Sequence, residues 1–294
     1  MEIRTKKMIF SSYLMLSKLR VVELLLITTV PAMIVSIYSF PPIKLILFTL
    51  IGGTFLAVSA NVLNQIFEIE QDRLMSRTLN RPLVTGEISV KNAYVFSIFI
   101  GCLGFFILYF FTTVLASFIA LSANVFYSII YTLVLKPRTN QNIVIGGAAG
   151  AAPVLIGWTA TGSSLEIGSW LLFLLVFLWT PAHFWALSLH NVEDYKEAQF
   201  PMLPTQESEK RTIIFIAIYG CATVITSILL TPILQLGIVY LYTSIILGSY
   251  LLLKTYSLYK KRITPISYFV FSNTYLALLF LSMVADIIFT LRNI

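Results

Sequence analysis

Long apolar runs recur along almost the whole of this 294-residue chain. A run of about 18 or more apolar residues can cross a hydrocarbon core of roughly 30 Å as a helix. Only 11% of the residues are charged and 58% are hydrophobic, whereas soluble domains carry about 25% charged residues. The chain is therefore predicted to be an all-α integral membrane protein with one transmembrane domain over residues 1–294. Nine spans are expected, at 20–39, 43–67, 91–110, 113–133, 142–160, 168–190, 211–230, 233–253 and 267–289.

The basic residues predict an orientation. Of the 20 Lys and Arg residues, all but Lys44 and Arg292 lie before the first span or in the connections after the even-numbered spans. Positive residues gather on the cytoplasmic side of a membrane, so we expect a cytoplasmic N-terminus and an outer C-terminus. We therefore interpret the net charge of +7 as a membrane-topology signal. It predicts contact with the lipid bilayer and no nucleic-acid partner. The lack of a Ser- and Arg-rich leader favours a bacterial plasma (inner) membrane.

A row of oxygen-bearing side chains closes the second expected span. Asn64, Glu68 and Asp72 are spaced i, i+4 and i+8, which places them on one face of a helix, about 6 Å apart along the axis. Such donors suit Mg²⁺, which binds few carboxylates and completes its shell with phosphate oxygens and water. Arg77 and Arg81 follow and can bind phosphate as bidentate donors. An ordinary solvated helix end with i,i+4 ion pairs explains the same spacing equally well.

A second acidic segment lies on the same expected side. Segments 68–90 and 191–210 hold nine of the thirteen acidic residues. The second segment offers further oxygen ligands and phosphate-binding candidates: Glu193, Asp194, Tyr195 and Lys196. Alone it is best interpreted as an ordinary acidic loop, but two acidic loops on one face indicate a diphosphate held by metal between them. Prenyl transfer uses such a site, because metal and arginine neutralise the leaving diphosphate while an apolar cavity shields the carbocation.

At these residues the chain resembles the UbiA superfamily of intramembrane prenyltransferases, and within it the branch that farnesylates haem. The likeness extends from about Tyr13 to Asp286 and rests on the order and spacing of several motifs. These motifs are Lys18-Leu-Arg20-Val-Val, Asn64-Gln-x-x-Glu68-x-x-x-Asp72, Met75-x-Arg77-Thr-x-Asn80-Arg81-Pro82, Tyr131-Thr-x-x-Leu-Lys136, Gly146-Gly-Ala-Ala-Gly150, Trp179-Thr-Pro181-x-His183-Phe-Trp185, Glu193-Asp194-Tyr195 and Pro201-Met-Leu-Pro204.

The resemblance implies a nine-helix UbiA-like bundle with a central cavity, in which two acidic motifs bind Mg²⁺ and farnesyl diphosphate. It implies farnesyl transfer to the 2-vinyl group of haem B, with addition of water, to give haem O for haem-copper oxidases. Downstream partners would be haem A synthase or the oxidase assembly machinery. By position, the catalytic metal ligands would be Asn64, Glu68, Asp72 and Asp194. The side chains facing phosphate would be Arg77, Arg81, Lys136 and Lys196.

His183 stands in an aromatic segment of the sixth expected span. It is a candidate to bind haem iron or a haem propionate, or to protonate the vinyl carbon. A hydrogen-bonded histidine that fixes the helix after Pro181 is an equally good interpretation. Gly146, Gly147 and Gly150 are expected to allow close helix packing.

Two other functions compete with haem farnesylation. A prenyltransferase of the same fold could act on an aromatic quinone precursor or a chlorin, although the Trp179–Trp185 segment resembles the haem branch. A transporter or channel would place its charges near the membrane midplane. The acidic residues here gather at the ends of spans and in loops, which disfavours transport.

Overall fold

Helices form all the regular structure in the computed structural model, which describes the backbone of residues 2–292 and the side chains of residues 10–19 and 27–289. The expected all-α fold is confirmed. The elements are α1 (Glu2–Ser17), α2 (Leu19–Ile37), α3 (Ile43–Phe67), α4 (Ile69–Asp72), η1 (Ser76–Thr78), α5 (Val90–Phe111), α6 (Val114–Val125), η2 (Phe126–Leu135), α7 (Asn142–Ala160), α8 (Ile167–His190), α9 (Val192–Glu197), α10 (Leu203–Gln206), α11 (Glu209–Ile233), α12 (Ile238–Tyr259) and α13 (Pro265–Arg292).

Within the described residues, eight segments are long and apolar enough to cross a membrane, so this is a multi-pass membrane protein. They are α3, α5, α6 together with η2, α7, α8, α11, α12 and α13. The first expected span, 20–39, coincides with α2, whose described apolar part runs from Ile27 to Ile37. The predicted orientation stays a prediction. It rests partly on side chains that lie outside the described residues: Arg4, Lys6, Lys7 and Arg20.

The eighth span differs from its expected position. It runs from Ile238 to Tyr259 rather than over 233–253. Asp286 of α13 fixes its start, because the carboxylate accepts hydrogen bonds from the backbone N–H groups of Gly237 and Tyr240, the latter at 3.2 Å. The first N–H groups of a helix have no partner within the helix, and an anion there also complements the helix dipole. Asp286 therefore has a structural role.

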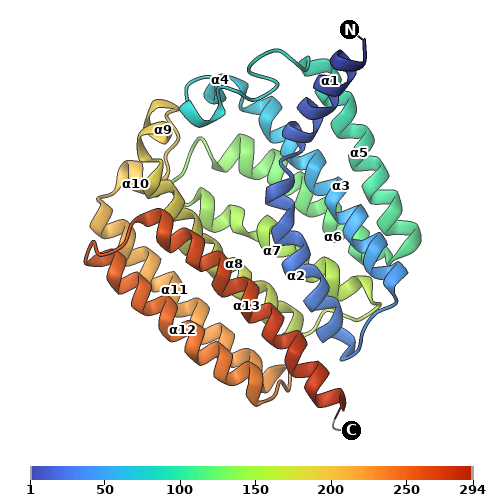
Figure 1. Cartoon of the computed structure of the whole chain (residues 1–294), viewed down its shortest axis with the longest axis vertical. Helices are drawn as coiled ribbons and strands as arrows, with labels where there is room; N and C mark the ends of the chain where they lie inside the picture. Colours follow the sequence, from blue (N-terminus) through green and yellow to red (C-terminus); the bar gives the residue numbers. More distant parts are fainter. Residues whose placement is uncertain (1, 293–294) are drawn as a thin grey trace.

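Helices α7 and α8 lie at the centre of the bundle (Figure 1). On one side of this centre, α2 and α6 pack on α7, and α3 packs against α5. On the other side, α11 packs on α8, and α12 packs against both α11 and α13. The short helices α4 and α9 lie near each other at one end of the bundle (Figure 1). The two acidic segments therefore share one end, as expected. The central cavity stays a prediction.

Glycines let α7 approach its neighbours closely, as expected in lipid. A Cβ atom at Gly146 would overlap the ring of Tyr131, and one at Gly157 would overlap the backbone carbonyl of Thr29. These contacts hold α7 against η2 on one side and against α2 on the other. They fix the position of η2, which carries part of the site described next.

Candidate active site

Asn64, Glu68 and Asp72 form a buried polar row, although the helix breaks among them. Helix α3 ends at Phe67, Glu68 has a non-helical backbone (φ −107°, ψ 14°), and α4 begins at Ile69. Two i→i+4 bonds persist across the break, from the Glu68 N–H to the Asn64 carbonyl (3.1 Å) and from the Asp72 N–H to the Glu68 carbonyl (2.8 Å). The three side chains are 3%, 4% and 1% exposed, respectively. The row is therefore not a solvated helix end.

Both carboxylates of this row are paired with basic side chains from elsewhere in the chain. The Nζ atom of Lys136 lies 2.5 and 2.6 Å from the two carboxylate oxygens of Glu68. The guanidinium of Arg81 donates to Oδ2 of Asp72. A buried charge costs several kcal/mol unless it is paired, so these cations make the burial of the two acids possible.

One carboxylate oxygen in the row has no partner among the described residues. Oδ1 of Asp72 is buried and accepts no hydrogen bond. An unsatisfied buried acceptor costs about 1–3 kcal/mol, and in a native structure it indicates an ion, a water or a functional role. Burial raises the pKa of the Asp72 carboxyl, and the Arg81 guanidinium opposes this shift.

The amide of Asn64 is held from two sides. Lys18 donates from Nζ to Oδ1 of Asn64 at 3.2 Å, and Nδ2 of Asn64 donates to Oγ1 of Thr132 at 3.1 Å. Removal of Lys18 from water, together with the positive charge of Arg81, lowers the pKa of its ammonium to about 7. Lys18 and Thr132 were not among the expected site residues.

Lys18 reaches the site because the chain turns at its position. It lies between α1 and α2 in the left-handed conformation (φ 48°, ψ 50°). Two buried amides of α3 bond the end of α1: Gln65 donates to the Leu16 carbonyl (2.6 Å) and Asn61 to the Ser17 carbonyl (3.5 Å). Helix α3 therefore carries Asn64 and also holds the segment that carries Lys18.

The fourth span becomes a π-helix, η2, where it approaches the site. Its wider turn is seen in the backbone bond from the Lys136 N–H to the Tyr131 carbonyl (2.8 Å) and in the bond from Thr132 Oγ1 to the Tyr127 carbonyl (2.9 Å). π-helical segments are rare and are frequently found at functional sites. Here the segment brings Thr132 to Asn64 and ends next to Lys136.

The second acidic segment is fastened to the first through Asp194. Its Oδ1 accepts hydrogen bonds from the backbone N–H (3.3 Å) and the hydroxyl (2.9 Å) of Ser76, and its Oδ2 lies 3.4 Å from Nε of Arg77. The guanidinium of Arg77 also lies over the ring of Tyr195, 4.9 Å from its centroid. Burial raises the pKa of the Tyr195 hydroxyl, so this tyrosine stays a neutral donor.

Lys136 links the two segments as well. Its Nζ atom lies over the ring of Phe200, 4.4 Å from the centroid, while it pairs with Glu68. Glu193 and Lys196 instead pair with each other at 3.0 Å, with side chains 76% and 51% exposed. The structure thus brings Asp194 and Tyr195 to the buried cluster and leaves Glu193 and Lys196 at the surface.

His183 lies away from this cluster, between α8 and α13. Its ring stacks between Trp179 and Phe269, with centroid distances of 4.2 Å to each. Its Nδ1 atom shares a 2.6 Å hydrogen bond with the hydroxyl of Ser272. Both faces of the imidazole are therefore covered, and only the ring edge is left for a further contact.

The donor chemistry of the cluster fits Mg²⁺ shared with a diphosphate better than a site made by protein alone. Among the described side chains, no three His, Cys, Asp or Glu residues converge as a metal site. The cluster offers carboxylate and amide oxygens, one of them the unsatisfied Oδ1 of Asp72, with cations beside them. Mg²⁺ is commonly held through one or two carboxylates plus substrate phosphates, and the cluster supplies such carboxylates.

Known proteins resemble this chain over most of its length. Residues 25–285 match the model of the UbiA prenyltransferase family. The protoheme IX farnesyltransferase of Paenarthrobacter aurescens is 42% identical over 284 residues, which cover 94% of this chain and 89% of that protein. The protoheme IX farnesyltransferase of a Synechocystis species is 44% identical over 279 residues, covering 94% and 88% of the two chains.

Solved structures share the fold. A structure of digeranylgeranylglyceryl phosphate synthase has a TM-score of 0.78 at 23% identity and covers 95% of this chain and 99% of its own. A UbiA homologue from Archaeoglobus fulgidus, bound to DMAPP and Mg²⁺, has a TM-score of 0.71 at 19% identity, with 94% and 99% covered. The helical bundle described here is therefore the architecture of these proteins.

Proposed function

Since this chain belongs to the UbiA prenyltransferase family, we propose that it transfers the farnesyl group of farnesyl diphosphate to a vinyl group of haem B, giving haem O and diphosphate. Relatives at 42% and 44% identity carry the name protoheme IX farnesyltransferase, which supports haem as the acceptor. The observation that carries the proposal is the buried cluster at one end of the bundle, where acids and cations from both acidic segments meet.

The cations of the cluster are the groups that bind the diphosphate in this proposal. Arg77, Arg81 and Lys136 each pair with a carboxylate within 3.4 Å, so their charged ends already lie among the oxygen donors. Charge-assisted bonds from arginine and lysine to phosphate are short and strong. Tyr195 adds a neutral donor next to Arg77.

The oxygen donors hold the metal in this proposal: Asn64, Glu68, Asp72 and Asp194. Bound Mg²⁺ would neutralise the diphosphate oxygens on which negative charge develops. Thr132 and Lys18 orient the Asn64 amide through the bonds described above. Glu193, the fifth candidate, and Lys196 lie at the rim of the site, because their charges are largely solvated.

The reaction breaks the bond between C1 of the farnesyl group and the diphosphate oxygen, which keeps the electron pair. The π electrons of the haem vinyl group form the new carbon–carbon bond. The cation left on the former vinyl carbon takes up the oxygen of water, which releases a proton, and a hydroxyl group results. The apolar helices shield the allylic cation from water until the vinyl group has reacted.

The haem site is assigned through a histidine of α8. His183 is our candidate for a haem contact, through the edge of its ring, since Trp179 and Phe269 cover both faces.

We place the cluster at the cytoplasmic face of a bacterial inner membrane, as the basic residues predict. Haem O would then pass to haem A synthase or to the oxidase assembly machinery.

Acceptor competition tests this function. Purified protein in detergent is supplied with farnesyl diphosphate and Mg²⁺, and with haem B, 4-hydroxybenzoate or a chlorophyllide in parallel reactions analysed by mass spectrometry. We expect product only with haem B, at the mass of haem plus one farnesyl group and one hydroxyl group. Product from 4-hydroxybenzoate or the chlorin, but not from haem B, would assign the chain to the alternative acceptor class.

A further inference from the structure

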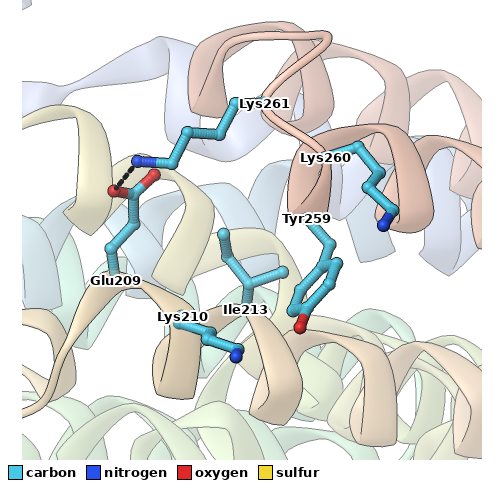
Figure 2. Close-up of a pocket in the computed structure, with 6 residues that line it drawn as sticks. All are labelled: Glu209, Lys210, Ile213, Tyr259, Lys260 and Lys261. Carbon is cyan, nitrogen blue, oxygen red and sulfur yellow. Dashed lines mark hydrogen bonds and ion pairs between the residues drawn. The ribbon is translucent and has the colours of Figure 1, made fainter.

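A lysine-lined pocket lies between the start of α11 and the end of α12, outside the site described above. Its volume is about 430 Å³, and its lining residues are Glu209, Lys210, Ile213, Tyr259, Lys260 and Lys261 (Figure 2). Three lysines and one carboxylate therefore line the pocket. Helix α11 follows the second acidic segment, so the pocket opens at the same end of the bundle as the candidate active site.

Two of these lysines have no acidic partner among the residues that the structure describes. Lys261 pairs with Glu209 at 3.0 Å. The Nζ atoms of Lys210 and Lys260 each lie 5.9 Å from the ring centroid of Tyr259, and neither forms an ion pair with any side chain in the described part of the chain. The pocket thus carries excess positive charge around one aromatic ring.

Of the three pocket lysines, Lys210 has an unfavourable position relative to the dipole of its helix. Lys260 and Lys261 stand at the C-terminal end of α12, where cations are favourable. Lys210 stands in the first turn of α11, where the positive end of the dipole repels a cation. An anion bound in the pocket would compensate for this repulsion.

The turn after α12 places the two neighbouring lysines on different sides of the pocket. The N–H groups of Arg262 and Lys261 donate to the carbonyls of Ser257 (2.8 Å) and Leu258 (2.9 Å), which is a Schellman helix end. Lys261 takes the left-handed position (φ 56°), which usually holds glycine because a side chain is strained there. The result is that Lys261 points to Glu209 while Lys260 extends away from Glu209 (Figure 2), with its Nζ atom 5.7 and 5.9 Å from the ring centroids of Tyr256 and Tyr259.

An apolar track continues from the pocket along α11. Ile214 and Ile218 follow Lys210 at i+4 and i+8 and are 45% and 56% exposed. Residues at this spacing lie on one helix face. Tyr256 and Tyr259 lie at the end of the adjacent span, where tyrosine commonly marks the membrane interface. This arrangement is complementary to a phospholipid: the lysines would contact the phosphate headgroup, and the apolar helix face below them would contact the acyl chains.

We propose that this pocket binds the phosphate headgroup of an anionic phospholipid from the leaflet at the active-site end, with an acyl chain lying along the exposed face of α11. Basic pockets between transmembrane helices bind such headgroups. The proposal does not depend on the reaction that the enzyme catalyses, because it rests on the charges and packing of α11 and α12 alone.

Lipid binding to the detergent-purified protein tests the proposal, with native mass spectrometry as the readout. The protein is titrated with phosphatidylglycerol or with phosphatidylcholine, and in a third arm with phosphatidylglycerol plus an equal concentration of inorganic phosphate. We expect preferential binding of phosphatidylglycerol that phosphate does not displace. The double variant Lys210→Gln/Lys260→Gln should bind it roughly 30-fold more weakly, since each lysine contributes about fivefold.

A charge-matched control separates the pocket from general surface charge. The double variant Lys91→Gln/Lys254→Gln loses the same charge at the same end of the bundle and should bind phosphatidylglycerol like the wild type. Equal losses in both doubles, equal binding of the two lipids, or displacement by equimolar phosphate would each overturn the proposal. If the pocket double does not fold, Lys260→Gln alone, whose side chain is exposed, should still weaken binding several-fold.

Discussion

The Nζ atom of Lys136 lies 2.5 and 2.6 Å from the two carboxylate oxygens of Glu68, although 68 residues separate them in the chain. This pair joins the end of the second span to the end of the fourth. Because Lys136 also covers the ring of Phe200, the same contact includes the second acidic segment. The pair therefore connects three parts of the chain, and it is also a component of the proposed diphosphate site.

Lys136→Met should therefore affect stability and activity in separable ways. It leaves the nearly buried Glu68 carboxylate unpaired, which should lower the free energy of unfolding by about 3–5 kcal/mol. Adding Glu68→Gln removes the unpaired charge and should restore most of that loss without restoring turnover. Thermal unfolding in detergent and product formation are measured on the same preparations. Recovery of activity in the double variant would show that the pair is only structural.

Asp72→Asn should abolish turnover while the protein remains folded. The amide keeps the size of the side chain and one acceptor oxygen, but it removes the charge that a metal and Arg81 share. Glu70→Gln is the matched control, because Glu70 lies on the same short helix and pairs with Arg73 at the exposed surface (2.9 Å). We expect Glu70→Gln to retain wild-type turnover. Equal activity of the two variants would contradict the ligand assignment of Asp72.

Thr132→Val should weaken catalysis through Asn64. The variant keeps the side-chain shape and removes the hydroxyl that accepts the 3.1 Å bond from the Asn64 amide. A lost neutral hydrogen bond of this kind should lower turnover roughly 3- to 10-fold and raise the Mg²⁺ concentration needed for half-maximal rate. Thr132→Ser should restore both values. An unchanged Mg²⁺ dependence in Thr132→Val would show that the hydroxyl does not orient a metal ligand.

Gly146→Ala should destabilise the bundle by about 1–3 kcal/mol, because the new methyl group would overlap the Tyr131 ring and force η2 to move. Gly150→Ala is the matched control on the same helix, since the nearest atom to its Cβ would be 3.9 Å away. Unfolding midpoints of the two variants should differ clearly. Similar midpoints would mean that α7 and η2 adjust without cost.

Hydrophobic length sufficed to predict the membrane helices. Spans such as 43–67 and 142–160 are reproduced as α3 and α7, because about 20 apolar residues leave few alternatives to a helix in lipid. The start of α12 could not be predicted in this way. It depends on Asp286, which comes from a distant part of the chain and binds the first N–H groups of the helix.

The spacing of Asn64, Glu68 and Asp72 predicted a shared face, and the structure confirms it despite the break at Glu68. The partners of this face were harder to predict. Lys18 reaches Asn64 only because the backbone turns at Lys18 itself, and Thr132 does so only because η2 has π-helical geometry. Both depend on contacts with other helices, such as Gly146 against Tyr131, so spacing along the sequence carried no signal for them.

Haem O formation by wild-type protein and by the paired variants Asp72→Asn and Glu70→Gln tests the central claim most directly. Each protein is incubated with haem B, farnesyl diphosphate and Mg²⁺, and the haem products are weighed by mass spectrometry. We predict haem O from the wild type and from Glu70→Gln, and none from Asp72→Asn or after chelation of Mg²⁺. No haem O from folded wild-type protein, or wild-type rates from Asp72→Asn, would contradict farnesyl transfer at this cluster.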